Sequence, residues 1–190
     1  MTGEPATALP VKALLDTNVL YPTVMREILL GCASAGLFAP LWSPRILDEW
    51  RHVAAREGPA DATLAEGEIA RIKARFPRAE VRPNASDEAR LHLPDEADIH
   101  VLASAIAGSA DVIVTQNRAD FPRGLLAAEG LERSDADAFL WQLWSEDPDK
   151  VATVVEVVRQ EAERLSGEIW HTRRLLKKAR LPRLGKALEA

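Results

Sequence analysis

The chain has 190 residues, of which 47% are hydrophobic and 28% charged, so it is long and apolar enough to bury the core of one ordinary domain. This composition excludes a disordered chain, and no apolar run reaches the roughly 18 residues that a membrane span requires. The single cysteine, Cys32, excludes an internal disulfide framework and a cysteine-built zinc site. We therefore expect a cytoplasmic protein with no membrane segment.

The net charge of −5 is unevenly distributed along the chain. Residues 1–158 carry 15 Lys and Arg against 25 Asp and Glu, a balance of −10, whereas residues 159–186 carry nine against three, a balance of +6. A basic segment on an acidic body predicts a polyanion or an acidic protein as partner. A solvated helix face explains the same pattern, and the sequence leaves both interpretations open.

Strands and helices are predicted to alternate over the first two thirds of the chain. Residues 1–10 are small and polar and are predicted to be a loose leader. Strands are expected at 11–15, 37–42 and 111–115, with a weaker candidate at 79–82, and helices at 22–35, 44–57, 61–76, 86–91 and 97–107. This alternation predicts an α/β fold with a doubly wound, mostly parallel sheet flanked by helices.

From Ser134 onward the pattern becomes purely helical. One helix is expected at 135–144 and a longer one from Asp147-Pro148, with Gly167 and Pro182 interrupting the remainder. We therefore predict an α/β domain at 11–132 and a C-terminal helical extension at 134–190.

Acidic and amide residues follow the predicted strands or open the predicted helices. Asp16 closes the first strand, Glu49 and Asp98 lie near helix starts, and Asn117 and Asp120 follow the strand that ends at Thr115. Ligands of a doubly wound sheet bind beyond the carboxyl ends of its strands. Carboxylate oxygens are the ligands that Mg²⁺ and Mn²⁺ prefer. The set therefore predicts a divalent-metal site, whereas each acid alone is also explained by solvation or by a helix dipole.

Four short motifs occur in a fixed order. They are Leu14-Leu15-Asp16-Thr17-Asn18-Val19-Leu20, then Ser43-Pro44 with Ile46 and Glu49, then Asp98 with Val101-Leu102-Ala103 and Ala105, then Val114-Thr115 with Asn117 and Asp120-Phe121-Pro122. Over about residues 11–130 this order resembles the PIN-domain nucleases, and within them the VapC-type toxins of bacterial toxin–antitoxin pairs. The resemblance implies a PIN nuclease domain at 11–132 that hydrolyses RNA phosphodiesters with Mg²⁺ or Mn²⁺. It also implies RNA and an antitoxin protein as partners, and a homodimer.

The resemblance assigns roles to individual residues. Asp16, Glu49 and Asp98 match the first three acids of the family, whereas Asn117 stands where many relatives have an aspartate. The metal ligands it implies are Asp16, Asp98, Glu49 and Asn117, and the catalytic residues are Asp16, Glu49, Asp98 and Asp120. Glu49 or Asp120 is expected to orient the attacking water, although Asp120 also fits a role in stabilising its loop. His100 is expected to be packed or solvated rather than to act as a base.

Three alternative hypotheses come from other classes. The first is a PIN-like module that binds RNA or a protein but cuts weakly or not at all, which the neutral Asn117 favours. The second is a phosphoryl-transfer enzyme of haloacid-dehalogenase type, which needs a second aspartate where this chain has Asn18. The third is a phospho-receiver domain, which needs an acid pair at the first strand.

Overall fold

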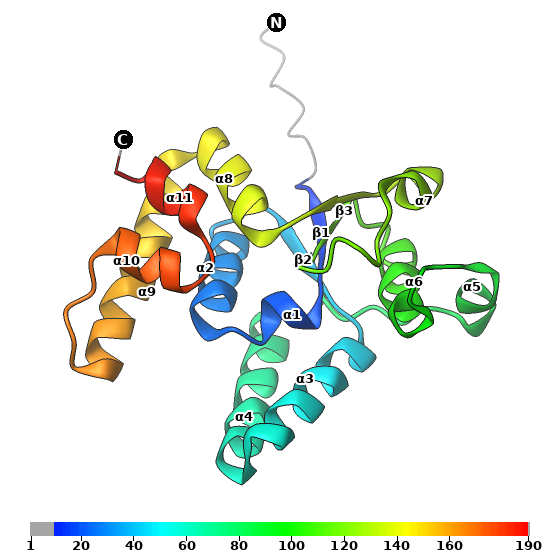
Figure 1. The fold of residues 1–190 in the computed structure, drawn as a ribbon, viewed down its shortest axis with the longest axis horizontal. Coiled ribbons are helices and arrows are strands. Elements are labelled where there is room, and N and C mark those ends of the chain that lie inside the picture. Colours follow the sequence, from blue (N-terminus) through cyan, green and yellow to red (C-terminus); the bar gives the residue numbers. More distant parts are fainter. Residues whose placement is uncertain (1–9, 190) are drawn as a thin grey trace, which may run out of the picture.

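A computed structural model describes residues 10–189, so the predicted leader, apart from Pro10, lies outside the described residues. Its centre is a four-stranded sheet in the order β2-β1-β3-β4 (Figure 1). The strands are β1 (Lys12–Leu15), β2 (Ala39–Leu41), β3 (Val112–Val114) and β4 (Glu132–Ser134), and every pairing is parallel. Leu14, Leu15 and Ile113 are fully buried because helices cover both faces of the sheet. Pro40 is tolerated because β2 is an edge strand of this sheet.

The chain winds the sheet in two directions. It leaves β1 through α2 (Thr23–Ser34) to reach β2 on one side, and later returns through α6 (Ile99–Ala107) to place β3 on the other side of β1. Figure 1 shows α2 and the C-terminal helices on one side of the strands and α5 to α7 on the other. The predicted doubly wound α/β fold is confirmed. Its topological switch lies between β1 and β3, where folds of this kind bind their ligands.

The other helices frame this sheet. They are α1 (Thr17–Leu20), α3 (Pro44–Glu57), α4 (Pro59–Arg75), α5 (Ala85–Arg90), the 3₁₀ turn η1 (Glu96–Asp98), α7 (Arg123–Ala128), α8 (Ala136–Glu146), α9 (Pro148–Ser166), α10 (Thr172–Lys178) and α11 (Pro182–Ala187). Among residues 10–189, no helix is both long and apolar enough to cross a membrane.

The C-terminal helices share the core of the sheet domain. Helix α9 packs against α2 and α8, and α11 packs against α8. Leu140, Val151, Leu176 and Leu184 are fully buried in the same hydrophobic cluster as the sheet. The C-terminal helical extension is therefore present and well packed. Its division from the rest near residue 133 stays a prediction.

Several short elements differ from the sequence prediction. Strand β4 was missed because Glu132, Arg133 and Ser134 are polar and at least partly exposed, as suits the edge of a sheet. Helix α1 was missed because it has only four residues and starts directly at the end of β1. The weak strand candidate at 79–82 forms only one isolated bridge, between Trp42 and Glu80. Helix α7 was also missed.

Candidate active site

Asp16 lies at the carboxyl end of β1 and is held by three hydrogen bonds. One carboxylate oxygen accepts the backbone N–H of Thr17 at 2.7 Å. The other accepts the Asn18 side-chain amide and the Thr115 hydroxyl, each at 2.7 Å. Only 5% of Asp16 is exposed, and burial raises the pKa of its carboxyl group although the Thr115 and Thr17 hydrogen bonds oppose the rise. Asp16 is thus a buried carboxylate whose oxygens already have protein donors.

The same polar network ties the end of β1 to the end of β3. The Asn18 carbonyl oxygen accepts the backbone N–H of Gln116 at 2.9 Å. The Thr115 hydroxyl oxygen accepts the backbone N–H of Asn117 at 3.0 Å. These contacts fix the loop after β3 against the first motif, so the side chains that follow Thr115 face the same space as Asp16.

Glu49 reaches this space from α3. Ser43 caps the start of this helix, because its hydroxyl accepts the N–H of Ile46. One Glu49 oxygen accepts the Thr17 hydroxyl at 3.0 Å, and the other lies 2.6 Å from Nε2 of His100. Burial acts to raise the pKa of Glu49, but His100 and Thr17 outweigh it and hold the pKa below its usual value. Glu49 is therefore ionised and oriented by two side chains of the protein.

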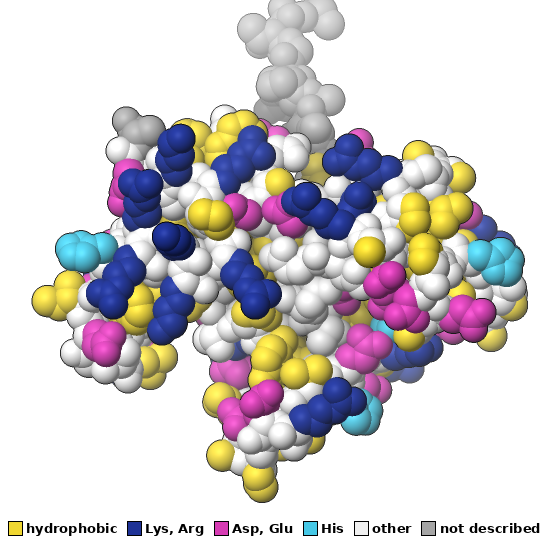
Figure 2. All heavy atoms as spheres, viewed as in Figure 1, with side chains coloured by type: hydrophobic (Ala, Val, Ile, Leu, Met, Phe, Trp, Pro, Cys, Tyr) yellow, Lys and Arg dark blue, Asp and Glu magenta, His cyan; other side chains and the backbone are white. Residues whose placement is uncertain are grey.

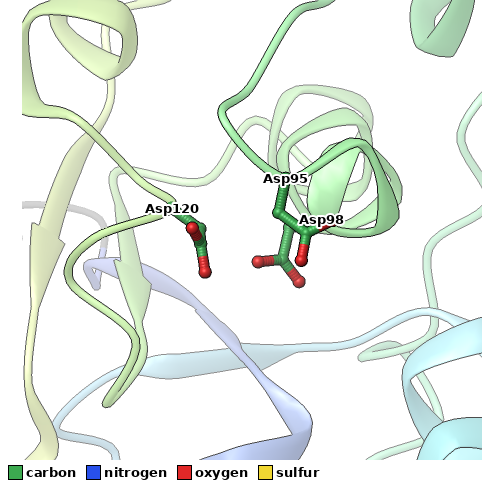
Figure 3. Close-up of side chains that lie close together, drawn as sticks. All are labelled: Asp95, Asp98 and Asp120. Atoms are coloured by element: carbon green, nitrogen blue, oxygen red, sulfur yellow. The ribbon is translucent and has the colours of Figure 1, made fainter.

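Asp98 ends η1 at the start of α6 and belongs to an acid cluster. Oxygen atoms of Asp95, Asp98 and Asp120 lie within 4.8 Å of one another, with Asp120 coming from the loop after β3 (Figure 3). The Asn117 side-chain nitrogen donates to Asp98 at 3.2 Å and also to Asp120. Burial, followed by the charges of Asp16, Asp95, Asp120 and Glu49, raises the pKa of Asp98 to about 6.

A cavity of about 590 Å³ joins these groups. Its lining includes Asp16, Glu49, Asp98 and Asn117, and it also includes Lys178 at the end of α10 and Arg180 in the turn that follows. Figure 2 shows Lys and Arg side chains gathered over α10 and α11 and acidic side chains gathered nearer α6. The cavity therefore has an acidic wall made by the end of β1, by α3 and by the start of α6, and a basic wall made by the C-terminal segment.

The family model described as PIN domain matches residues 12–119, which is more than half of the chain. The chain belongs to the PIN domain family. Comparisons with curated proteins and with solved structures returned no match. PIN domains are generally nucleases that use a divalent metal, and an acid cluster suited to a metal is present here.

The donor set of this PIN domain fits a hard cation such as Mg²⁺ or Mn²⁺. It offers carboxylate oxygens from two segments within a few ångströms, and burial together with the repulsion of the neighbouring carboxylates raises the pKa of Asp98. A cation among clustered carboxylates offsets that repulsion. Asn117, predicted as a ligand through its carbonyl oxygen, instead turns its amide nitrogen toward Asp98 and Asp120.

The structure brings all five predicted site residues to this region, in two overlapping groups. Asp16, Glu49, Asp98 and Asn117 line the cavity, and Asp120 joins Asp98 in the acid cluster. Whether they bind a metal and catalyse stays a prediction.

Two neighbours of the site were not assigned from the sequence. Asp95 lies three residues before Asp98 and was interpreted only as part of a helix start, where its side chain does accept the N–H of Ala97. A second acid in the turn that precedes Asp98 was the available signal. His100 is 1% exposed, which agrees with a packed residue, but its contact with Glu49 joins α6 to α3 and had no signal in the sequence.

Proposed function

We propose that this PIN domain is a Mg²⁺- or Mn²⁺-dependent endoribonuclease that hydrolyses RNA phosphodiesters. The observation that carries the proposal is the cavity at the ends of β1 and β3, where Asp16, Glu49 and Asp98 face Lys178 and Arg180. Acids that could hold a metal and cations that could hold phosphates thus line one space. That combination suits a polyanionic substrate cut with the help of a metal.

Asp16 and Asp98 would hold the metal, with Glu49 and Asn117 close by. Asp95 and Asp120 offer a second set of oxygens around Asp98. A bound divalent metal would lower the pKa of a coordinated water and offset charge on the scissile phosphate.

The protein's own residues would orient the reactants. Glu49 is ionised and held by Thr17 and His100, so it can accept a hydrogen bond from the attacking water and take its proton. Asp120 is the second candidate for this role. Asn18 and Thr115 fix the position of Asp16 by hydrogen bonds.

The basic C-terminal segment, residues 159–186, would guide the RNA backbone into the cavity. Lys178 and Arg180 line the cavity, and neither has a carboxylate partner within 4 Å among residues 10–189. The ammonium nitrogen of Lys178 also lies 4.8 Å from the centre of the Trp170 ring, a cation–π contact. On this proposal the extension at 134–190 supplies a substrate-binding wall to the nuclease domain at 11–132.

A double variant tests this wall. Lys178→Gln with Arg180→Gln should weaken RNA binding and make its salt dependence shallower by about 0.7 for each RNA phosphate that the protein no longer binds. Its Mn²⁺ affinity should stay the same. The matched control is Arg56→Gln with Arg78→Gln, two exposed arginines on other elements. Equal RNA affinity in the two double variants would show that this wall does not guide the RNA.

Incubation with total cellular RNA tests the function itself. We expect cleavage with Mg²⁺ or Mn²⁺, none with a chelator, and none from the Asp98→Asn protein with metal. Persistent cleavage by Asp98→Asn would place the chemistry elsewhere.

We further propose that the protein is a toxin of VapC type that acts in the cytoplasm as a homodimer and is neutralised by an antitoxin. The resemblance of its four motifs supports this proposal. Induced expression should arrest growth, and a small DNA-binding reading frame beside the gene should relieve the arrest. Light scattering of the purified protein measures the homodimer directly.

A second candidate function is a PIN domain that binds RNA or a protein without cutting. The neutral Asn117, which donates to Asp98 and Asp120 instead of adding a charge, favours it. This candidate predicts RNA retention with no cleavage at any Mg²⁺ or Mn²⁺ concentration.

A further inference from the structure

A second, smaller pocket lies beside the end of β3 and is lined by arginines. Its volume is about 160 Å³, and its lining includes Arg118, Arg123 and Arg133 together with Thr115 and Asp135. The arginines come from the loop after β3, from α7 and from β4, so three separate segments converge on one small space.

The charges of this pocket are only partly balanced. Asp135 is its acid, and it is engaged by the Arg118 guanidinium and by the backbone N–H of Ala138 at 2.8 Å, which it caps at the start of α8. Arg123 and Arg133 have no carboxylate within 4 Å among residues 10–189. Nε of Arg133 is buried and has no hydrogen-bond partner in the described part of the chain. Two guanidinium groups therefore remain available to an anion.

Thr115 connects this pocket with the acid site. It lines the pocket, and its hydroxyl donates to Asp16 at 2.7 Å. The cavity that contains the acids and the pocket that contains the arginines therefore lie on either side of one residue at the end of β3.

We propose that the Arg123–Arg133 pocket binds a backbone phosphate that neighbours the scissile phosphate on the same RNA strand. Guanidinium groups match the geometry of phosphate oxygens with paired hydrogen bonds, and they stay charged at any physiological pH. The pocket is too small for a drug-sized ligand but has room for a phosphate group. The inference rests on the proposed ribonuclease function for the identity of the strand.

The test is the binding of short single-stranded RNA in EDTA, so that no strand is cut. Arg123→Gln with Arg133→Gln should lower the affinity at least about threefold and make the log–log salt slope shallower by about 0.7, the value for one phosphate bound on a single strand. Arg56→Gln with Arg78→Gln is the control of equal charge. Arg123→Gln alone, at an exposed position, repeats the test if the double variant has a lowered melting temperature.

Single uncharged methylphosphonate linkages locate the bound phosphate. Scanned along the RNA, they should weaken binding to the parent protein at one linkage close to the cut, and they should cause no further loss there in the double variant. A double variant that binds RNA like the control overturns the proposal. So does one that keeps its RNA affinity but loses binding to polyglutamate, because the pocket then receives protein carboxylates. Loss of RNA affinity in a protein that proves unable to cleave refutes the proposed activity and keeps the phosphate site.

Discussion

Asp16 and Asp98 line one cavity, but the groups that surround the two carboxylates differ. At the end of β1, the Asp16 oxygens accept hydrogen bonds from Thr17, Asn18 and Thr115. At the start of α6, Asp98 has one amide donor, Asn117, and burial together with the charges of the surrounding acids raises its pKa to about 6. The protein thus fixes the position of the Asp16 carboxylate, whose pKa is raised by burial, and places the Asp98 carboxylate among like charges.

This difference assigns separate tasks to the two acids. A carboxylate fixed by three donors gives a metal site its geometry, because its position does not change when a cation arrives. A carboxylate that lies among like charges favours metal binding, because a bound cation relieves the repulsion between those charges. The variants below test this division from the largest expected effect to the smallest.

The largest effect is expected for metal binding in Asp98→Asn. The substitution removes the carboxylate that lies among the other acids, so Mn²⁺ affinity and RNA cleavage should both fall by more than about 100-fold, beyond the 10- to 100-fold typical of outer-shell groups. Calorimetric titration with Mn²⁺ and cleavage of a labelled RNA measure the two quantities. Asp61→Asn, an exposed acid on α4, is the control. An Asp98→Asn variant that binds Mn²⁺ as tightly as the parent would contradict the task assigned to Asp98.

The next effect is a loss of stability in Asp16→Asn without metal. An amide nitrogen in place of a carboxylate oxygen would face a donor, either the Thr17 N–H or the Asn18 amide. A buried donor left without an acceptor costs about 1–3 kcal/mol, so the free energy of unfolding should fall by roughly that amount. Urea denaturation in EDTA measures it. A variant as stable as the parent would show that the hydrogen bonds of Asp16 are not stabilising.

The sequence predicted more of the Asp16 region than of the Asp98 region for a physical reason. An apolar run that ends in an acid is recognisable in the sequence. Residues 11–16 alone therefore predicted both the buried β1 and the location of Asp16. Asp95 and Asp120 meet Asp98 only because the turn before α6 folds against the loop after β3, which no local pattern contains.

Side-chain contacts between distant elements were equally hidden. Glu49 and His100 contact each other although they lie 51 positions apart, on α3 and α6. Strand β4 carries too few apolar residues to be recognised as a strand. By contrast, the starts of two long helices were predictable from their caps. Ser43 before Pro44 and Asp147 before Pro148 mark the starts of α3 and α9 in the sequence, and both side chains cap their helices.

A smaller effect is expected for His100→Gln, which extends the comparison to Glu49. His100 holds Glu49 at 2.6 Å and touches neither Asp98 nor Asp16 through a hydrogen bond. Loss of an orienting residue should lower the rate of cleavage about tenfold and leave Mn²⁺ affinity within about twofold, the lower end of outer-shell effects. His52→Gln, on the exposed face of α3, is the control. A parallel loss of Mn²⁺ affinity would mean that His100 supports the metal site as a whole.

The smallest expected effect is a gain in the stability of the metal-free protein on Asp98→Asn, and this gain depends on pH. In the metal-free parent, folding raises the pKa of Asp98 from 3.8 to about 6, so the folded state binds the proton more tightly than the unfolded state. Below pH 3.8 the group is protonated in both states and has no effect on stability. As the pH rises from about 4 to 6 the unfolded state loses its proton first, and the parent loses stability until the folded carboxyl is also ionised.

Asp98→Asn removes this loss because an amide does not ionise. The full shift corresponds to about 3 kcal/mol, and solvent screening of a partly exposed carboxyl reduces the expected gain to about 1 kcal/mol. In EDTA the variant should therefore match the parent near pH 3.5 and exceed its free energy of unfolding above pH 6.5, and saturating Mn²⁺ should reverse the order at neutral pH. A gain that is the same at pH 3.5 and pH 7 would have to come from packing rather than charge, and the charge on Asp98 would then not be what destabilises the metal-free parent.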